Sequence, residues 1–167
     1  MRRAFGNSVR RMQTLRAAPP ANCDQLFGRF VADVLPPEAS QAARIHLREL
    51  AQPVSAVGGE AVFSSTTQAR VVHIARGSVR LVAHASQQRD QVLSFHFAGD
   101  LVLVPARGAH GYTLYALGEC EMLAFAADPL FELARKEPGL GHALLTRTLR
   151  ALARSREKTI ALGRKTA

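Results

Sequence analysis

Apolar residues recur at helical spacing near both ends of the chain and alternate with polar residues in its middle. Between residues 24 and 35 they stand three or four positions apart, which predicts an amphipathic helix. Two consecutive prolines end this helix. A second amphipathic helix is predicted within residues 37–50, with Ala42, Ile45 and Leu47 at its apolar positions. Two helices are therefore expected before the first strand.

The middle of the chain, residues 53–126, consists of short β-rich runs separated by glycine turns. In the run 91–97, Leu93, Phe95 and Phe97 are expected on one face, with Ser94 and His96 on the other. Gln87 and its neighbours form a polar hairpin tip, and turns are expected at Gly58, Gly59, Gly77, Gly99 and Gly118. This spacing predicts a mainly β fold with flanking helices, in the form of a barrel or a jelly roll (double-stranded β-helix).

Helical spacing returns after residue 127. A short helix is predicted with Asp128 as its N-cap and Pro129 at its first helical position. A long amphipathic helix follows, and such a narrow apolar stripe usually packs against a partner helix. We predict a homodimer whose interface includes Leu145, Leu149, Leu152, Arg156 and Ile160, with Arg156 interrupting the stripe. The alternative is a helix folded back on its own β-roll.

Composition limits the class of protein. The chain has 167 residues and a formal net charge of +9, and no apolar run approaches the ~20 residues needed to span a bilayer. Its basic start lacks the apolar core of a secretory signal. Cys23 and Cys120 match no metal or redox spacing. We expect a cytoplasmic protein with reduced thiols and no metal site.

The positive charge is concentrated at the two ends of the chain. Such charge suits a polyanion, and it equally suits a solvated helix face and a mobile arm. Weak, non-specific nucleic-acid binding is the most that we expect from the charge itself. No P-loop, HExxH or nucleophile–histidine motif is present, so we expect that the chain is not an enzyme.

Several segments, in this order, resemble the Crp/Fnr family of bacterial transcription regulators. They read VGGEAVFSS, VVHIARGSVRLV (as a hairpin with Gly77 at its turn), QVLSFHFAGDLV, ALGECEMLAF, DPLFELARKEPGL and LGRKTA. QVLSFHFAGDLV is similar to the Fnr-type branch. The resemblance implies a jelly roll of the cyclic-nucleotide-binding-domain type followed by a dimerisation helix. It divides the chain into a basic flexible arm (1–22), helices and a β-roll sensor domain (23–137), and a dimerisation helix with a hinge (138–167).

The family continues from that hinge into a winged helix-turn-helix domain, which this sequence does not reach. We expect an effector-sensing and dimerisation domain truncated before its DNA-binding domain, so that DNA is bound only through the absent part. A stand-alone β-roll interaction protein, pairing with itself or with full-length relatives, is the alternative.

The resemblance also suggests where an effector would bind. The family's phosphate cassette is matched only by Arg107 and Thr113, without its glutamate and its spacing, so classical cAMP is not expected. An iron–sulfur cluster needs four cysteines, and the chain has two. Some branches of the family bind haem, for which candidate axial ligands are His46, His73, His84, His96, His110 and His142. The pocket for an unknown small effector is expected around His96, Gly99, Asp100, Arg107, His110 and Thr113.

Overall fold

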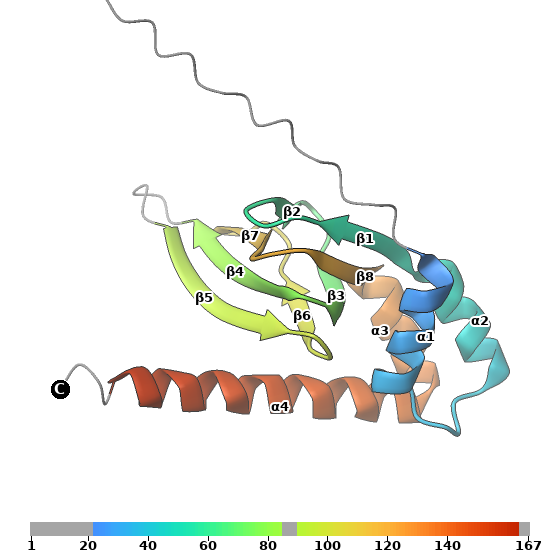
Figure 1. Ribbon diagram of the computed structural model, residues 1–167. Coiled ribbons are helices and arrows are strands. Elements are labelled where there is room, and N and C mark those ends of the chain that lie inside the picture. Colours follow the sequence, from blue (N-terminus) through green and yellow to red (C-terminus); the bar gives the residue numbers. More distant parts are fainter. Residues whose placement is uncertain (1–21, 85–89, 164–167) are drawn as a thin grey trace, which may run out of the picture.

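Two four-stranded antiparallel sheets face each other, and helices pack at one end of them (Figure 1). The computed structural model describes residues 22–84 and 90–163, with side chains up to Arg154. Most of the predicted arm and the predicted hairpin tip therefore lie outside the described residues. The elements are α1 (Cys23–Val34), α2 (Gln41–Leu50), β1 (Gln52–Ala56), β2 (Ala61–Ser64), β3 (Arg70–Arg76), β4 (Ser78–His84), β5 (Asp90–Phe97), β6 (Leu101–Val104), β7 (Gly111–Ala116), β8 (Cys120–Ala126), α3 (Ala127–Lys136) and α4 (Pro138–Gly163).

The order of strands within each sheet identifies the fold as a jelly roll. One sheet, called sheet A, has the order β1-β8-β3-β6, and the other, sheet B, has the order β2-β7-β4-β5. The chain changes sheet at every connection between consecutive strands except that from β4 to β5. The prediction of a mainly β jelly roll with flanking helices and a long C-terminal helix is confirmed.

One predicted hairpin is wrong. The segment around Gly77 was expected to join two paired strands, but β3 pairs with β6 and β8 while β4 pairs with β5 and β7. Gly77 therefore carries the chain from sheet A to sheet B. A glycine between two β-rich runs marks a sharp turn in either case, so the local pattern does not distinguish the two arrangements.

The helix starts also differ from expectation. Ser40 caps α2, so α2 begins at Gln41 and buries Ala43 and Leu47, while Ile45 is 53% exposed. The predicted apolar face is thus wrong at Ala42 and Ile45, which are both exposed, and right at Leu47. The predicted N-cap Asp128 is also wrong, because α3 begins at Ala127. The Ala127 amide donates to the carbonyl of Ala69, so the end of β8 sets the start of this helix.

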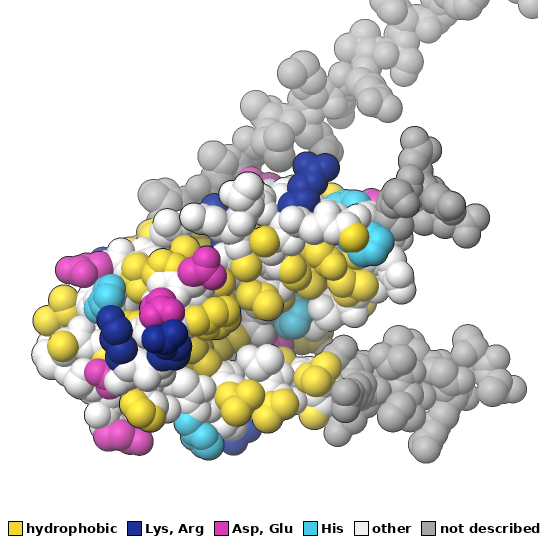
Figure 2. Space-filling view, turned by 180° about the vertical axis from the view of Figure 1, so that it is seen from behind, with side chains coloured by type: hydrophobic (Ala, Val, Ile, Leu, Met, Phe, Trp, Pro, Cys, Tyr) yellow, Lys and Arg dark blue, Asp and Glu magenta, His cyan; other side chains and the backbone are white. Residues whose placement is uncertain are grey.

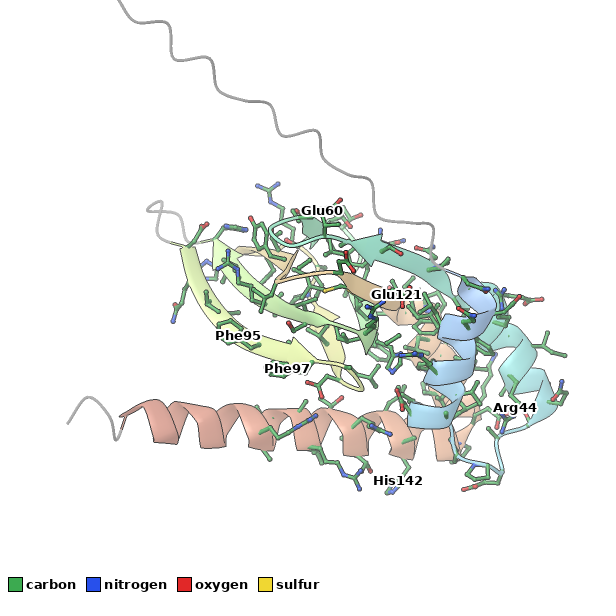
Figure 3. The ribbon with its side chains drawn as sticks, viewed as in Figure 1. Arg44, Glu60, Phe95, Phe97, Glu121 and His142 are labelled. Carbon is green, nitrogen blue, oxygen red and sulfur yellow. The ribbon has the colours of Figure 1, made fainter. Side chains whose placement is uncertain are left out.

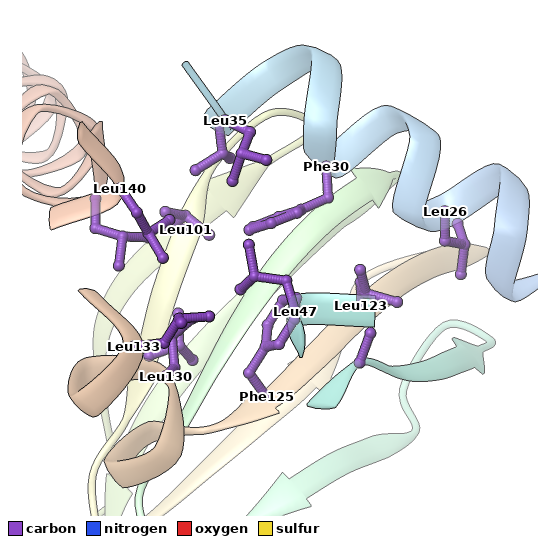
Figure 4. Close-up of a cluster of buried hydrophobic side chains, with 14 of the residues drawn as sticks. Leu26, Phe30, Leu35, Leu47, Leu101, Leu123, Phe125, Leu130, Leu133 and Leu140 are labelled. Carbon is purple, nitrogen blue, oxygen red and sulfur yellow. The ribbon is translucent and has the colours of Figure 1, made fainter. Parts of the chain in front are cut away.

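The core has two parts. One fills the space between the two sheets. The other lies between sheet A and the helices, where the Phe30 ring is 4.9 Å from that of Phe125 (centroid to centroid) and Leu140 of α4 is fully buried (Figure 4). Leu144 is also buried, which anchors the first turns of α4 to the domain. In the part of the chain that the structure describes, no helix is sufficiently long and apolar to span a membrane.

Candidate functional site

The six residues predicted to form one effector pocket lie in two places. Arg107, His110 and Thr113 line a cavity at one end of sheet B. Gly99 and Asp100 lie instead at the corner between β5 and β6, against α4. The four residues of β6 separate that corner from the 105–110 loop by about 13 Å of strand. His96 lies on β5, where its Nε2 is 2.8 Å from the Ser94 hydroxyl.

The cavity, which we call the hydroxyl pocket, has a volume of about 440 Å³. Strand pairing assembles it, because Ser64 at the end of β2 pairs with Thr113 of β7, and His84 at the end of β4 pairs with Gly111. Residues paired across antiparallel strands share a face. Leu114, the neighbour of Thr113, points into the core between the sheets, so Thr113 and His84 face outward. The described lining residues are Ser64, Ser65, His84, Arg107, Gly108, Ala109, His110, Gly111, Tyr112 and Thr113.

A chain of hydrogen bonds runs along the floor of this pocket. His84 Nδ1 lies 2.7 Å from Asp90 Oδ1, and His84 Nε2 lies 2.8 Å from Thr113 Oγ1. Thr113 Oγ1 lies 3.3 Å from Ser64 Oγ. A carboxylate only accepts, so Nδ1 carries a proton, and in the neutral ring Nε2 accepts from Thr113. Sequence reasoning missed His84 and Ser64 as pocket residues, because only the pairing of β4, β7 and β2 brings them together.

A second group of contacts joins the β5–β6 corner to α4. We call Gly99, Asp100, Arg147 and Arg154 the corner clamp. The Asp100 carboxylate is buried, accepts from the Phe97 amide at 3.0 Å and forms an ion pair with Arg154. Arg147, two helical turns before Arg154, donates to the Gly99 carbonyl at 3.4 Å. Their spacing of seven residues puts both arginines on one face of α4, a signal that the sequence contains.

The predicted stripe of α4 is exposed. Leu145, Leu149 and Leu152 are 58%, 55% and 47% exposed, whereas Leu140 and Leu144 pack into the domain. Apolar side chains therefore reach the surface along α4 (Figure 2). Arg156 and Ile160, also predicted at the interface, lie beyond the described side chains.

The predicted apolar face of β5 is exposed as well. Leu93, Phe95 and Phe97 are all exposed, and the two phenylalanines lie on the side of the β-roll that faces α4 (Figure 3). The stripe and this strand therefore present apolar side chains on neighbouring elements.

The six histidines offered as haem ligands do not converge on one site. His46 and His142 are exposed, and His142 lies on the side of α4 away from the β-roll (Figure 3). His84 and His110 share the hydroxyl pocket, but hydroxyls and an arginine line it, which does not fit an apolar macrocycle. Among the described residues, no group of three histidine, cysteine or acidic side chains is placed to hold a metal ion.

His73 is fully buried, and its contacts with Asp33 and Phe30 make it part of the core rather than of a ligand site. Its Nε2 lies 2.9 Å from Asp33 Oδ2, and its ring stands edge-on to Phe30 at 5.6 Å between centroids. Burial lowers the pKa of His73 and outweighs the opposing effect of Asp33, while Arg147 and Arg29 lower it further. The folded protein therefore holds this imidazole neutral more strongly than the unfolded chain does.

This lowered pKa predicts acid destabilisation. As the pH falls below about 6.5, the unfolded chain takes up the His73 proton before the folded protein does, so the free energy of unfolding decreases. One such group contributes a slope of at most about 1.4 kcal/mol per pH unit. Urea unfolding at several values between pH 5 and 8 should show a smaller slope for His73→Gln than for the wild type. Equal slopes would contradict the prediction.

No family model matches the chain. The chain is 30% identical over 110 residues to the transcriptional activator protein FnrL of Cereibacter sphaeroides, covering 66% of this chain and 44% of FnrL. It is 29% identical over 125 residues to the nitrogen fixation regulation protein FixK of Azorhizobium caulinodans, covering 70% of this chain and 50% of FixK. The chain thus spans about half the length of the curated relatives that it matches.

Solved structures share the fold at low sequence identity. Oxidized CprK in complex with o-chlorophenolacetic acid superposes with a TM-score of 0.53 at 12% identity, covering 74% of this chain and 52% of CprK. A CooA mutant from Carboxydothermus hydrogenoformans gives a TM-score of 0.56 at 11% identity, covering 87% of this chain and 90% of CooA. The relatives named here are regulators rather than enzymes, in agreement with the sequence. The chain is thus similar in sequence to regulators of the Crp/Fnr type, and it shares the fold of their solved structures.

Proposed function

We propose that this chain is the effector-sensing and dimerisation part of a Crp/Fnr-type transcription regulator whose effector is not classical cAMP. The observation that carries the proposal is the exposed stripe Leu145–Leu149–Leu152 on a helix whose first turns are anchored in the domain. The relatives FnrL and FixK are named as an activator and as a regulation protein, which supports a regulatory role.

A second copy of this chain is the proposed partner of the stripe. Leu145, Leu149 and Leu152 are four and three residues apart, which is the spacing of the apolar positions in a two-helix coiled coil. Two identical stripes of this kind can pack against each other across a two-fold axis. Burying one leucine side chain contributes about 1.5–3 kcal/mol, so a few leucines from each copy suffice for association. Crp/Fnr regulators are homodimeric DNA-binding proteins, which supports the same partner.

The corner clamp supports a mechanical link by which a movement of the β-roll is transmitted to α4. Asp100 and Gly99 attach the β-roll to α4 at Arg147 and Arg154, away from the exposed leucines. A shift of the β-roll would therefore turn α4 relative to its partner helix. Residues 23–137 act as the sensor and residues 138–167 as the dimerisation helix and hinge. DNA binding is proposed only for a form of the protein that carries a helix-turn-helix domain.

Sedimentation equilibrium tests the dimer. We expect a wild-type dimer, and we expect Leu149→Ala to raise the dissociation constant at least about tenfold, because each copy loses apolar contact area at the seam. Ile45→Ala is the matched control, since Ile45 is exposed to a similar extent on α2, and it should leave association unchanged. A strictly monomeric wild type at high micromolar concentration would refute the proposal.

A further inference from the structure

Two charged side chains of α1 reach strand β3 beside the apolar core. Arg29 Nη1 donates to the Ala75 carbonyl at 3.0 Å, and Asp33 Oδ2 lies 2.9 Å from His73 Nε2. Arg29 and Asp33 are about one helical turn apart, and the two residues that they contact are neighbours but one on β3. These two contacts therefore fix the position of the C-terminal half of α1 on sheet A.

The imidazole of His73 is buried with only one of its two nitrogens hydrogen-bonded. The residue is fully buried, its ring stands edge-on to Phe30, and Nδ1 has no hydrogen-bond partner among the described residues. A carboxylate only accepts, so Nε2 of the neutral ring carries the proton and donates to Asp33. A second proton at Nδ1 would create a buried N–H without an acceptor, which loses the hydrogen bond that it forms in water.

The charges that face His73 come from two helices. Burial opposes the protonated ring most strongly, Asp33 of α1 favours it, and Arg147 of α4 and Arg29 of α1 oppose it. The residues paired with His73 on β6 and β8 are both leucines. The Asp100 carboxylate at the neighbouring corner is bound to the main chain of β5 and to α4. The net effect lowers the pKa of His73, so the ring takes up a proton only below about pH 6.5.

The end of α1 packs directly against the start of α4. Leu35, which follows the last residue of α1, belongs to the same buried cluster as Leu140 of α4 (Figure 4). A Cβ added at Gly139 would lie 3.2 Å from the Pro36 ring, so the first turn of α4 approaches the chain closely here. The Asp33 side chain is 39% exposed, so a small outward movement of this end of α1 admits water to the pair. Such a movement also removes packing from the first turn of α4.

We propose that His73 and Asp33 form an acid-sensitive latch between α1 and the β-roll. Above about pH 6.5 the neutral ring donates to Asp33 and the latch is closed. Protonation opens the latch, because the charged ring gains water only when the end of α1 leaves β3, and the first turns of α4 are loosened with it. The latch itself follows from these contacts, whereas any effect on dimerisation or sensing rests on the proposed function.

Amide hydrogen exchange at about pH 7.5 and about pH 5 measures the latch. Protection factors are compared, because they remove the intrinsic pH dependence of exchange. We expect protection in residues 30–35 and 139–145 to fall at least about tenfold at the lower pH, while protection in β8 falls less. The His73 ring resonances should titrate at the same pH as this loss, with a midpoint below about 6.5.

Four substitutions separate the latch from general acid destabilisation. His73→Gln still offers a donor to Asp33 but takes no charge, so the fall in protection should disappear. Asp33→Asn removes the negative charge beside the ring and should move the His73 midpoint and the loss of protection to lower pH. Arg147→Gln removes an opposing positive charge and should move the midpoint to higher pH. His46→Gln, at an exposed histidine of α2, is the control and should behave as the wild type.

Equal protection at the two pH values would overturn the latch, and so would a fall that persists in His73→Gln. If that variant does not fold, a loss of protection that stays at the wild-type pH in Asp33→Asn overturns the latch equally. A fall as large in β8 as in α1 would overturn it too, because the whole domain then unfolds. A monomer that shows the pH response would refute the proposed dimer alone, and a dimer that lacks this response would refute the latch alone.

Discussion

Replacing Gly77 with alanine is expected to lower the free energy of unfolding by about 3 kcal/mol. The main chain at Gly77 has φ = +88°, a conformation that costs L-residues about 1–2 kcal/mol. In addition, an added Cβ would lie 2.4 Å from the Glu119 carbonyl oxygen and 2.8 Å from Cys120 Sγ. Overlap of this kind, with main chain that cannot move aside, typically costs a further 1–3 kcal/mol.

Gly59→Ala separates these two contributions. Gly59 has φ = +86°, but a Cβ there would meet nothing within 4 Å. This control should therefore cost only the conformational part, about 1–2 kcal/mol. Urea unfolding followed by circular dichroism measures both variants. Equal losses for the two would show that the crossing between the sheets at Gly77 tolerates a side chain.

Gly77 also shows what the sequence could predict about the fold. Glycines between alternating runs predicted the turns at Gly59, Gly77 and Gly99, and all three have positive φ. The partner of each strand was less accessible, because pairing depends on residues far apart in the chain. For that reason the sequence predicted a hairpin at Gly77, where the chain in fact crosses from one sheet to the other.

The candidate site was predictable to a similar degree. The turn at Gly99 and Asp100 and the apolar stripe of α4 followed from local patterns, since each depends on a few neighbouring residues. The sequence identifies His84 only as one of six candidate haem ligands, because its contact with Thr113 depends on the register of β4 against β7. The attachment of Asp100 to Arg154 requires α4 to pass beneath the β5–β6 corner, which no local pattern encodes.

Asp100→Asn is expected to loosen α4 without unfolding the domain. The asparagine carbonyl can still accept from the Phe97 amide and so preserve the corner. Its amide group would however face Arg154 with a donor in place of a carboxylate, so the ion pair is lost. Hydrogen bonds to charged groups contribute about 1.5–3 kcal/mol, and the half-exposed Arg154 places the expected loss at the lower end of this range.

Hydrogen exchange of the α4 amides is the direct measurement of this loss. A local loss of about 1–2 kcal/mol speeds exchange about 5- to 30-fold, and we expect this change at residues 147–154 while the amides of β3 and β8 keep their rates. Arg154→Gln should reproduce the effect, because it removes the other half of the pair. Arg150→Gln should not, since Arg150 is exposed beside the clamp. If α4 exchanges at the wild-type rate in Asp100→Asn, the clamp does not hold the helix, and α4 is attached to the β-roll through Leu140 and Leu144 instead.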